Sequence, residues 1–210
     1  KIDDYEIADD GSIKLSKDLL TDYKHAIDLH HTGEDIDITY SRAGKVRTTT
    51  LDADRALESY SLVAGEQFDE TPKYYIYGGI LFVPLNMNLI KRWGNDWSRA
   101  APVALLQARN EWSSPERRER VVALQVLAAD VNLGYHDWRN WVVDSVNGEP
   151  IRDFAHFSNM VKNTDAENIV FENTNGYQMI INHADAVDSA QQILGQYRIP
   201  AAYSKELFPE

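Results

Sequence analysis

The chain has 210 residues, of which 43% are hydrophobic and 26% charged, so it carries enough apolar material for a packed core and wholesale disorder is excluded. Its formal net charge of -12 argues against a nucleic-acid or anionic-membrane partner, because phosphate groups are recognised by basic surfaces. The absence of cysteine excludes disulfides, thiolate nucleophiles and cysteine metal sites.

The first third of the chain is the most acidic part and predicts a small mixed unit. Residues 2–7 predict a strand with a turn, and the chain begins inside it, which favours a fragment of a longer protein. Residues 16–31 predict an amphipathic helix, because their apolar side chains recur at a spacing of three to four. Residues 36–51 predict a β-hairpin that turns at Ala43-Gly44.

The rest of the chain predicts a longer series of the same kinds of element. We expect one continuous strand over residues 74–83 and a hairpin that turns at Asn175-Gly176, the strongest short hairpin signal in the sequence. The remaining predicted elements are strands over 121–127, 141–146, 169–172 and 177–181, and helices over 88–93, 102–112, 153–162 and 184–197.

An internal repeat organises these elements. Residues 2–7 and 146–151 share an apolar, turn, apolar layout, and each is followed by a predicted helix and then by a hairpin. The sequence therefore predicts an α+β fold with one truncated and one complete copy of a small module. The predicted organisation is a first module over 1–55, a connector over 56–73, a second module over 74–185 with an insertion at 86–120, and a C-terminal helix and tail over 186–210.

Several short motifs resemble the plant-type Deg (HtrA-like) serine proteases and their bacterial relatives. Residues 78–85 (GGILFVPL) resemble the family's G-L-V-F-x-P-L run, and residues 126–135 (VLAADVNLGY) resemble its V-L-x-x-x-x-N-I-G-Y. Residues 146–151 (VNGEPI) match its x-N-G-x-P-[IV], and residues 7–13 (IADDGSI) resemble a segment of its first PDZ domain. Because the matches follow in order over most of the chain, their combination is specific.

The resemblance implies the latter part of a first PDZ domain followed by a second PDZ domain, each a small partly open β-barrel with flanking helices. It implies a non-catalytic peptide-binding and assembly module, because the sequence has no Gly-x-Ser-Gly-Gly-like nucleophile loop and Gly11-Ser12 is followed by Ile13-Lys14. The parent protein is then expected to be a serine endopeptidase that works in protein quality control. The alternatives are a stand-alone PDZ scaffold and, less favoured, an enzyme in its own right such as an acidic hydrolase.

The resemblance places a peptide-binding groove in the second module. PDZ domains add an extended peptide to a sheet edge and hold its terminal carboxylate on backbone N–H groups, for which glycine is suited. The predicted groove residues are Gly78, Gly79, Ile80, Leu81, Phe82, Val83, Phe154, Phe157, Ser158 and Val161. Two alternatives stay open: these apolar residues are core, or another part of the protein occupies the groove.

No catalytic residue, metal site or cofactor is predicted. His25, His30 and His31 lie on one predicted helix, but their spacing is not the i, i+4 pattern of a helical metal site. Sequence adjacency in Asp9-Asp10 does not create the shared pocket that a pair of catalytic carboxylates needs.

The expected partners are peptide or protein C-termini and further copies of the same chain through the second PDZ domain. No nucleic acid and no membrane is expected, since the longest apolar run, residues 78–85, is far shorter than the roughly 20 residues that span a bilayer. The resemblance favours the bacterial periplasm or cell envelope as the compartment, and the sequence leaves the compartment otherwise undetermined.

Overall fold

The computed structural model describes residues 1–54 and 60–208. The chain divides into two compact units, unit 1 (Lys1–Ser59) and unit 2 (Tyr60–Glu210), and each is described by itself. The division falls inside the predicted connector, whose residues 56–59 lie outside the described part of the chain. From Tyr60 onward the predicted connector belongs to unit 2, because Leu62 and Val63 are buried in it.

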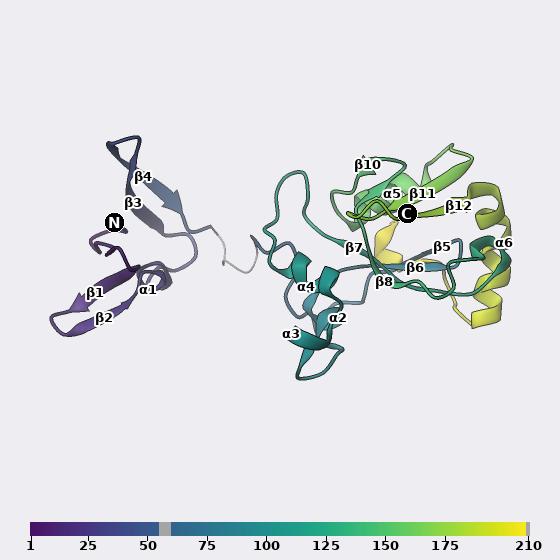
Figure 1. The fold of residues 1–210 in the computed structure, drawn as a ribbon, viewed down its shortest axis with the longest axis horizontal. Helices are drawn as coiled ribbons and strands as arrows, with labels where there is room; N and C mark the ends of the chain where they lie inside the picture. Colours follow the sequence, from purple (N-terminus) through teal and green to yellow (C-terminus); the bar gives the residue numbers. More distant parts are fainter. Residues whose placement is uncertain (55–59, 209–210) are drawn as a thin grey trace. The chain divides into compact units, whose positions relative to one another are not determined.

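Unit 1 consists of two β-hairpins and one short helix around a small core (Figure 1). Its elements are β1 (Ser12–Ser16), β2 (Leu19–Asp22), α1 (Lys24–Asp28), β3 (Asp35–Arg42) and β4 (Lys45–Asp52). The hairpin predicted over 36–51 is confirmed as β3 and β4. The helix predicted over 16–31 is wrong over most of its length, because Leu19–Asp22 pair with β1 as a strand and the helix is confined to α1.

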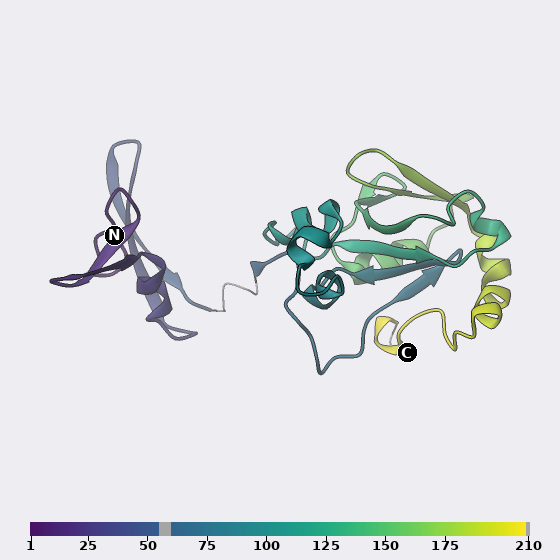
Figure 2. The same cartoon turned by 60° about the horizontal axis from the view of Figure 1, so that its bottom comes forward.

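Unit 2 contains two four-stranded open sheets, with the strand orders β5-β6-β7-β8 and β10-β9-β11-β12. Figure 2 shows the strands of the first sheet side by side. The strands are β5 (Tyr75–Tyr77), β6 (Ile80–Pro84), β7 (Val121–Val126), β8 (Arg139–Val143), β9 (Ser145–Val146), β10 (Glu149–Pro150), β11 (Asn168–Glu172) and β12 (Gln178–Asn182). The predicted α+β class is therefore confirmed, with sheets that are not closed into barrels.

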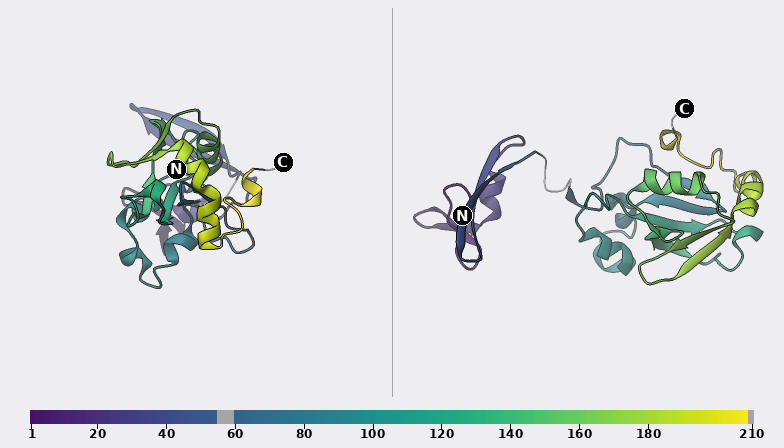
Figure 3. Two further views of the ribbon diagram at one scale, coloured as in Figure 1. Left: turned by 90° about the vertical axis from the view of Figure 1, so that its right-hand side faces the viewer. Right: turned by 90° about the horizontal axis from the view of Figure 1, so that it is seen from above.

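The helices of unit 2 cover the sheets on different sides (Figure 3). Helix α5 lies over the strands, and α6 lies at one end of the unit. The helical elements are α2 (Met87–Lys91), α3 (Trp97–Ala100), α4 (Val103–Arg109), the 3-10 turn η2 (Asp130–Asn132), α5 (Phe154–Lys162), α6 (His183–Tyr197) and the 3-10 turn η3 (Lys205–Leu207). The predicted helices over 153–162 and 184–197 are confirmed as α5 and α6.

The sheet β5-β6-β7-β8 is apolar on both faces, which explains the continuous apolar run of β7. Val121 and Ala123 pack into the main core beside α5 and the second sheet. Val122, between them, packs instead against the inserted helices α2 to α4, with Leu85 and Leu105. Successive strand residues point to opposite faces, so a strand covered on both sides has no polar face. The insertion predicted at 86–120 thus forms the second layer of this sheet.

The internal repeat is reproduced in atomic detail. In unit 1, Asp3 has φ 45°, its N–H donates to the Asp37 carbonyl at 2.8 Å, and its Oδ1 accepts the Asp37 N–H at 3.0 Å. In unit 2, Asn147 has φ 49°, its N–H donates to the Val170 carbonyl at 2.8 Å, and its Oδ1 accepts the Val170 N–H at 2.7 Å. Asp3 and Asn147 therefore occupy the same position in two copies of one module.

Replacing Asn147 tests this position. Asn147→Ala removes the side-chain acceptor of the Val170 N–H and places a residue with no such hydrogen bond in the left-handed region, so we expect the free energy of unfolding of unit 2 to fall by about 1–3 kcal/mol. Asn147→Gly removes the same acceptor without the steric strain and should cost less than Asn147→Ala. Urea unfolding followed by circular dichroism measures both, and an Asn147→Ala variant as stable as the original would contradict the assignment.

Candidate functional site

The sheet edge predicted for peptide addition begins with a tight turn rather than a straight strand. The prediction of one strand over 74–83 is wrong: β5 and β6 form an antiparallel hairpin that turns through Gly78 and Gly79. Both glycines have positive φ, 53° and 76°, which reverses the chain in two residues. A run of apolar residues on both sides of the turn concealed it in the sequence.

Close packing around the turn leaves no room for side chains at either glycine. A Cβ at Gly79 would lie 2.4 Å from Asn132 Nδ2 and 2.7 Å from the Leu127 carbonyl oxygen. A Cβ at Gly78 would lie 2.8 Å from Cγ2 of Ile181 on β12. Glycine is therefore required here for space as well as for φ.

Asn132 is a residue of the site that sequence reasoning missed. Its side chain is fully buried, and its Nδ2 donates to the Gly78 carbonyl at 2.8 Å and to the Leu127 carbonyl at 2.9 Å. Its Oδ1 accepts the Ala129 N–H at 3.0 Å. A buried amide with all these bonds made is a strong positional constraint. Asn132 is the asparagine of the motif at 126–135, but nothing in the local sequence indicates that it contacts a turn more than fifty residues earlier.

A comparison of two glycines tests the tightness of this turn. Gly79 and Gly176 have nearly the same φ, 76° and 77°, but a Cβ at Gly176 would meet nothing within 4 Å. Gly176→Ala should therefore cost only the conformational strain, about 1–2 kcal/mol. Gly79→Ala adds a steric clash with buried backbone and should cost about 1–3 kcal/mol more in unfolding free energy. Equal losses for the two variants in urea unfolding would show that the turn can relax.

The predicted groove residues come together, but most of them lie in the interior. Ile80, Phe82, Phe154, Phe157 and Val161 belong to one buried core cluster, and the rings of Phe82 and Phe157 are 4.8 Å apart between centroids. The remaining predicted residues differ in exposure: Ser158 is buried with its hydroxyl donating to the Phe154 carbonyl, whereas Leu81 and Val83 are half-buried.

Both edges of β6 are already paired. One edge carries β7, and the edge on which a peptide would add carries β5, with Tyr75 opposite Phe82 and Tyr77 opposite Ile80. The burial of the apolar groove residues is what the core alternative predicts, and β5 lies on the edge of β6 that a peptide would need. The reason is local, since a two-residue turn folds β5 back onto β6 without a loop.

The C-terminal tail extends the same sheet beyond β5. The Ile76 N–H donates to the Ala202 carbonyl at 2.6 Å, and the Ser204 N–H donates to the Tyr74 carbonyl at 3.1 Å. The Phe208 ring then packs edge-on against Tyr75, with 5.7 Å between ring centroids. Burial raises the pKa of the Tyr75 hydroxyl to about 12, so Tyr75 stays neutral in this cluster.

A cavity of about 270 Å³ remains beside the Gly78–Gly79 turn. Its walls are mainly apolar side chains of β5, α5, α6 and the tail, and its polar features are few. The lining residues include Tyr77, Val161, Lys162, His183 and Ala190, and the two glycines complete the wall.

The polar groups around this cavity fall into two sets. The Tyr77 hydroxyl and His183 Nδ1 satisfy each other at 2.7 Å, and burial raises the pKa of the Tyr77 hydroxyl, which therefore stays protonated. In contrast, within residues 1–54 and 60–208 the N–H groups of Gly78 and Gly79 make no hydrogen bond. Lys162, which also lines the cavity, has its ammonium 4.0 Å from the centroid of the Phe208 ring.

Two carboxylates occupy the N-terminus of α5. Asp153 Oδ1 accepts the His156 N–H at 2.7 Å, and Glu119 Oε2 from the insertion accepts the Phe154 N–H at 2.7 Å. Burial alone would raise the pKa of Asp153, but the His156 N–H and the Arg152 guanidinium outweigh it and the pKa is lowered. Glu119 therefore ties the insertion to the helix that forms one side of the site.

Asp153 predicts a pH dependence of stability. A carboxyl whose folded pKa is below its unfolded value of about 3.9 stabilises the fold above that value, and loses this contribution as the pH falls through the folded pKa. Asp153→Asn should therefore be less stable than the original chain at about pH 7, and the difference should shrink below about pH 4. Urea unfolding across this range gives the difference, and a constant difference would contradict the assignment.

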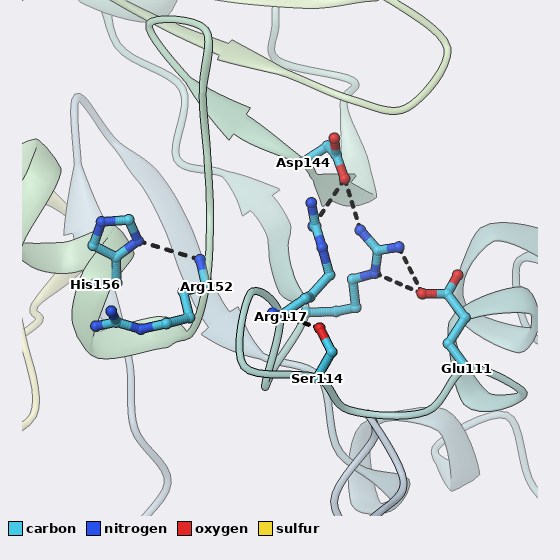
Figure 4. Close-up of polar contacts among 7 residues, drawn as sticks. Glu111, Ser114, Arg117, Asp144, Arg152 and His156 are labelled. Atoms are coloured by element: carbon cyan, nitrogen blue, oxygen red, sulfur yellow. Dashed lines mark hydrogen bonds and ion pairs between the residues drawn. The ribbon is translucent and has the colours of Figure 1, made fainter.

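A charged network joins the insertion to the strands (Figure 4). Arg120 Nη1 lies 2.7 Å from Asp144 Oδ1, and its Nη2 lies 2.6 Å from Glu111 Oε2. Arg117 Nη1 reaches the same Asp144 oxygen at 2.8 Å. Burial, followed by the neighbouring Arg120, lowers the pKa of the Arg117 guanidinium. In the close-up the two arginines converge on Asp144, so the polar segment 111–120 is anchored to β8 and β9 at this point.

Comparison with known proteins identifies the family. The sequence matches the PDZ domain family over residues 63–206. The chain belongs to the PDZ domain family. Its matched region is unit 2 almost in full, including the insertion and the tail strand. In the described residues no helix is long and apolar enough to cross a membrane, and no group of three or more histidine and carboxylate side chains could hold a metal ion.

The relatives of this PDZ chain are Deg proteases, which confirms the resemblance drawn from its motifs. It is 26% identical over 201 residues to the mitochondrial protease Do-like 4 of Arabidopsis thaliana, covering 96% of this chain and 36% of that protein. It is 27% identical over 208 residues to the chloroplastic protease Do-like 2 of the same plant, covering 98% and 33%. The chain thus spans about a third of the length of these relatives. Their names give organelles, and the expected bacterial periplasm is not supported.

Proposed function

We propose that this chain is the non-catalytic PDZ module of a Deg-type serine protease and that unit 2 recognises the C-terminus of a polypeptide. The family and the protease relatives support the first part. The second part rests on the apolar cavity, whose wall includes Lys162 and the two glycines with unpaired backbone N–H groups. Such a combination suits a polypeptide C-terminus: the N–H groups bind the terminal carboxylate, and the apolar wall accommodates an apolar side chain of the last residue.

The paired state of β6 defines how a ligand would bind. Because β5 covers the β6 edge, an extended peptide cannot add there without displacing part of the hairpin. We infer that the ligand engages through its last one or two residues, with the carboxylate on the glycine amides and the side chain among Val161, Ala190 and their neighbours. Fewer hydrogen bonds than in full strand addition should make the affinity weaker than micromolar, or about -5 to -7 kcal/mol.

The test is a titration of the chain with a peptide library, each hit repeated as its C-terminal amide. The expected result is binding that disappears on amidation. Ala190→Phe should fill the cavity and abolish this binding, whereas Ala184→Phe, at an exposed position of α6 outside the cavity wall, should leave it unchanged. Isothermal titration calorimetry measures affinity, and circular dichroism verifies that both variants are folded.

Two results would contradict the proposal. Equal binding of acid and amide forms would mean that no carboxylate is captured. An absence of binding at high micromolar peptide would mean that the self-paired groove is closed to peptides, and assembly with neighbouring subunits would then be the better account. The same closed β6 edge favours this second function, and sedimentation velocity of the chain over a range of concentrations measures it directly.

A further inference from the structure

Two asparagines of this chain, Asn147 and Asn175, are followed directly by a glycine. In such a pair the backbone nitrogen of the glycine can attack the side-chain amide carbon of the asparagine. The new C–N bond closes a succinimide ring and ammonia leaves, and water then opens the ring to give aspartate or isoaspartate. Glycine favours this reaction because it has no side chain to obstruct the attack.

Both pairs lie in turns of unit 2, and both asparagines are exposed. Asn147 lies between β9 and β10, and Asn175 lies between β11 and β12. Because exposure is the same, it does not distinguish the two sites. The difference between them is the hydrogen bonding of the asparagine side chain.

The side chain of Asn147 is held by β11. Its Oδ1 accepts the Val170 N–H at 2.7 Å, and the Asn147 N–H donates to the Val170 carbonyl at 2.8 Å. Asn147 thereby continues the pairing of β9 with β11 beyond Val146 and Phe171. Ring closure requires the side chain to rotate toward the Gly148 nitrogen, and this rotation leaves the Val170 N–H without its acceptor. The fold therefore resists the reaction at Asn147.

Asn175 has no comparable restraint on its side chain. Within residues 1–54 and 60–208 its side-chain amide makes no hydrogen bond, because Asn173 Oδ1 accepts the N–H groups of the turn, those of Asn175 at 2.9 Å and Tyr177 at 3.0 Å. The Gly176 N–H donates to the Asn173 carbonyl at 3.0 Å, so one backbone bond must open before the attack. This bond lies at the tip of a hairpin, where local opening costs least.

We propose that Asn175 is a site of spontaneous deamidation in the folded protein and that the fold protects Asn147. Each conversion takes up one water and releases one ammonia, so no oxidant or reductant is needed. The product is a carboxylate at position 175, and the isoaspartate form carries one additional main-chain carbon. A carboxylate at position 147 would suit the fold, since Asp3 makes the same hydrogen bonds in unit 1. The protection of Asn147 thus comes from the restraint on its side chain, not from an unsuitable product.

Peptide mapping by mass spectrometry tests the proposal on the full chain, aged in mildly alkaline buffer at physiological temperature. The mass gain from amide to acid identifies each converted site. We expect Asn175 to convert about tenfold or more faster than Asn147, because one hydrogen bond of ordinary strength shifts an equilibrium by about this factor. In concentrated urea, where the restraint on Asn147 is lost, the two sites should convert at similar rates.

A variant of the turn gives the matching result. Asn175→Ser should abolish most of the ammonia that the folded chain releases, whereas Asn95→Ser, at another exposed asparagine, should leave the release unchanged. Equal conversion of the two Asn-Gly pairs in the folded chain, or faster conversion of Asn147, would overturn the proposal. Conversion of neither pair in the folded chain, with both converting in urea, would overturn it as well, since the hairpin tip would then be closed to the reaction.

Discussion

The buried side chain of Asn132 is the interaction on which the architecture of unit 2 depends. Its amide holds the Gly78 carbonyl and the Leu127 carbonyl together, which fixes the turn between β5 and β6 against the end of β7. This turn places β5 on the edge of β6 that is not paired with β7. Because the interior cannot accommodate a Cβ at Gly79, the turn is held in this arrangement, and the cavity lies beside it.

The position of β5 on β6 changes which backbone groups of the PDZ unit are available to a ligand. A PDZ domain whose β6 edge was open would bind a peptide mainly through backbone hydrogen bonds along several residues. Here β5 and then the tail residues 202–204 occupy the successive edges, and the polar groups left over are concentrated at the turn itself. Under the proposed function the ligand is therefore held in a compact cavity rather than along an extended strand edge, and the size and charge of its last residue determine binding.

The two copies of the module share the same local hydrogen bonds at the start of each copy. Asp3 and Asn147 make the same pair of hydrogen bonds at the same left-handed position, so the local folding rule is shared. In unit 2 the second strand of the corresponding hairpin, β12, lies against η2 and α6.

The sequence by itself determined the local elements whose signals are contained within a few residues. The hairpins over 36–51 and 169–181 were readable from alternation and from the Ala43-Gly44 and Asn175-Gly176 turns, and α5 from its apolar face. The motifs also identified the family. Sequence reasoning failed where a residue's role depends on a distant partner: residues 19–22 became a strand by pairing with β1, and the run over 74–83 became a hairpin.

Only the tertiary structure decided whether the groove residues are surface or core. Phe82 and Phe157 have the same apolar character in either case, and they are buried because both sheets and α5 meet in one core cluster, where both rings pack against Phe171. The tail bridges to β5 at Tyr203 and bonds Tyr74 through Ser204, over a separation of 130 residues. The apolar pattern of a sequence predicts that a side chain is buried. Which segment covers that side chain depends on long-range packing, which the local sequence does not contain.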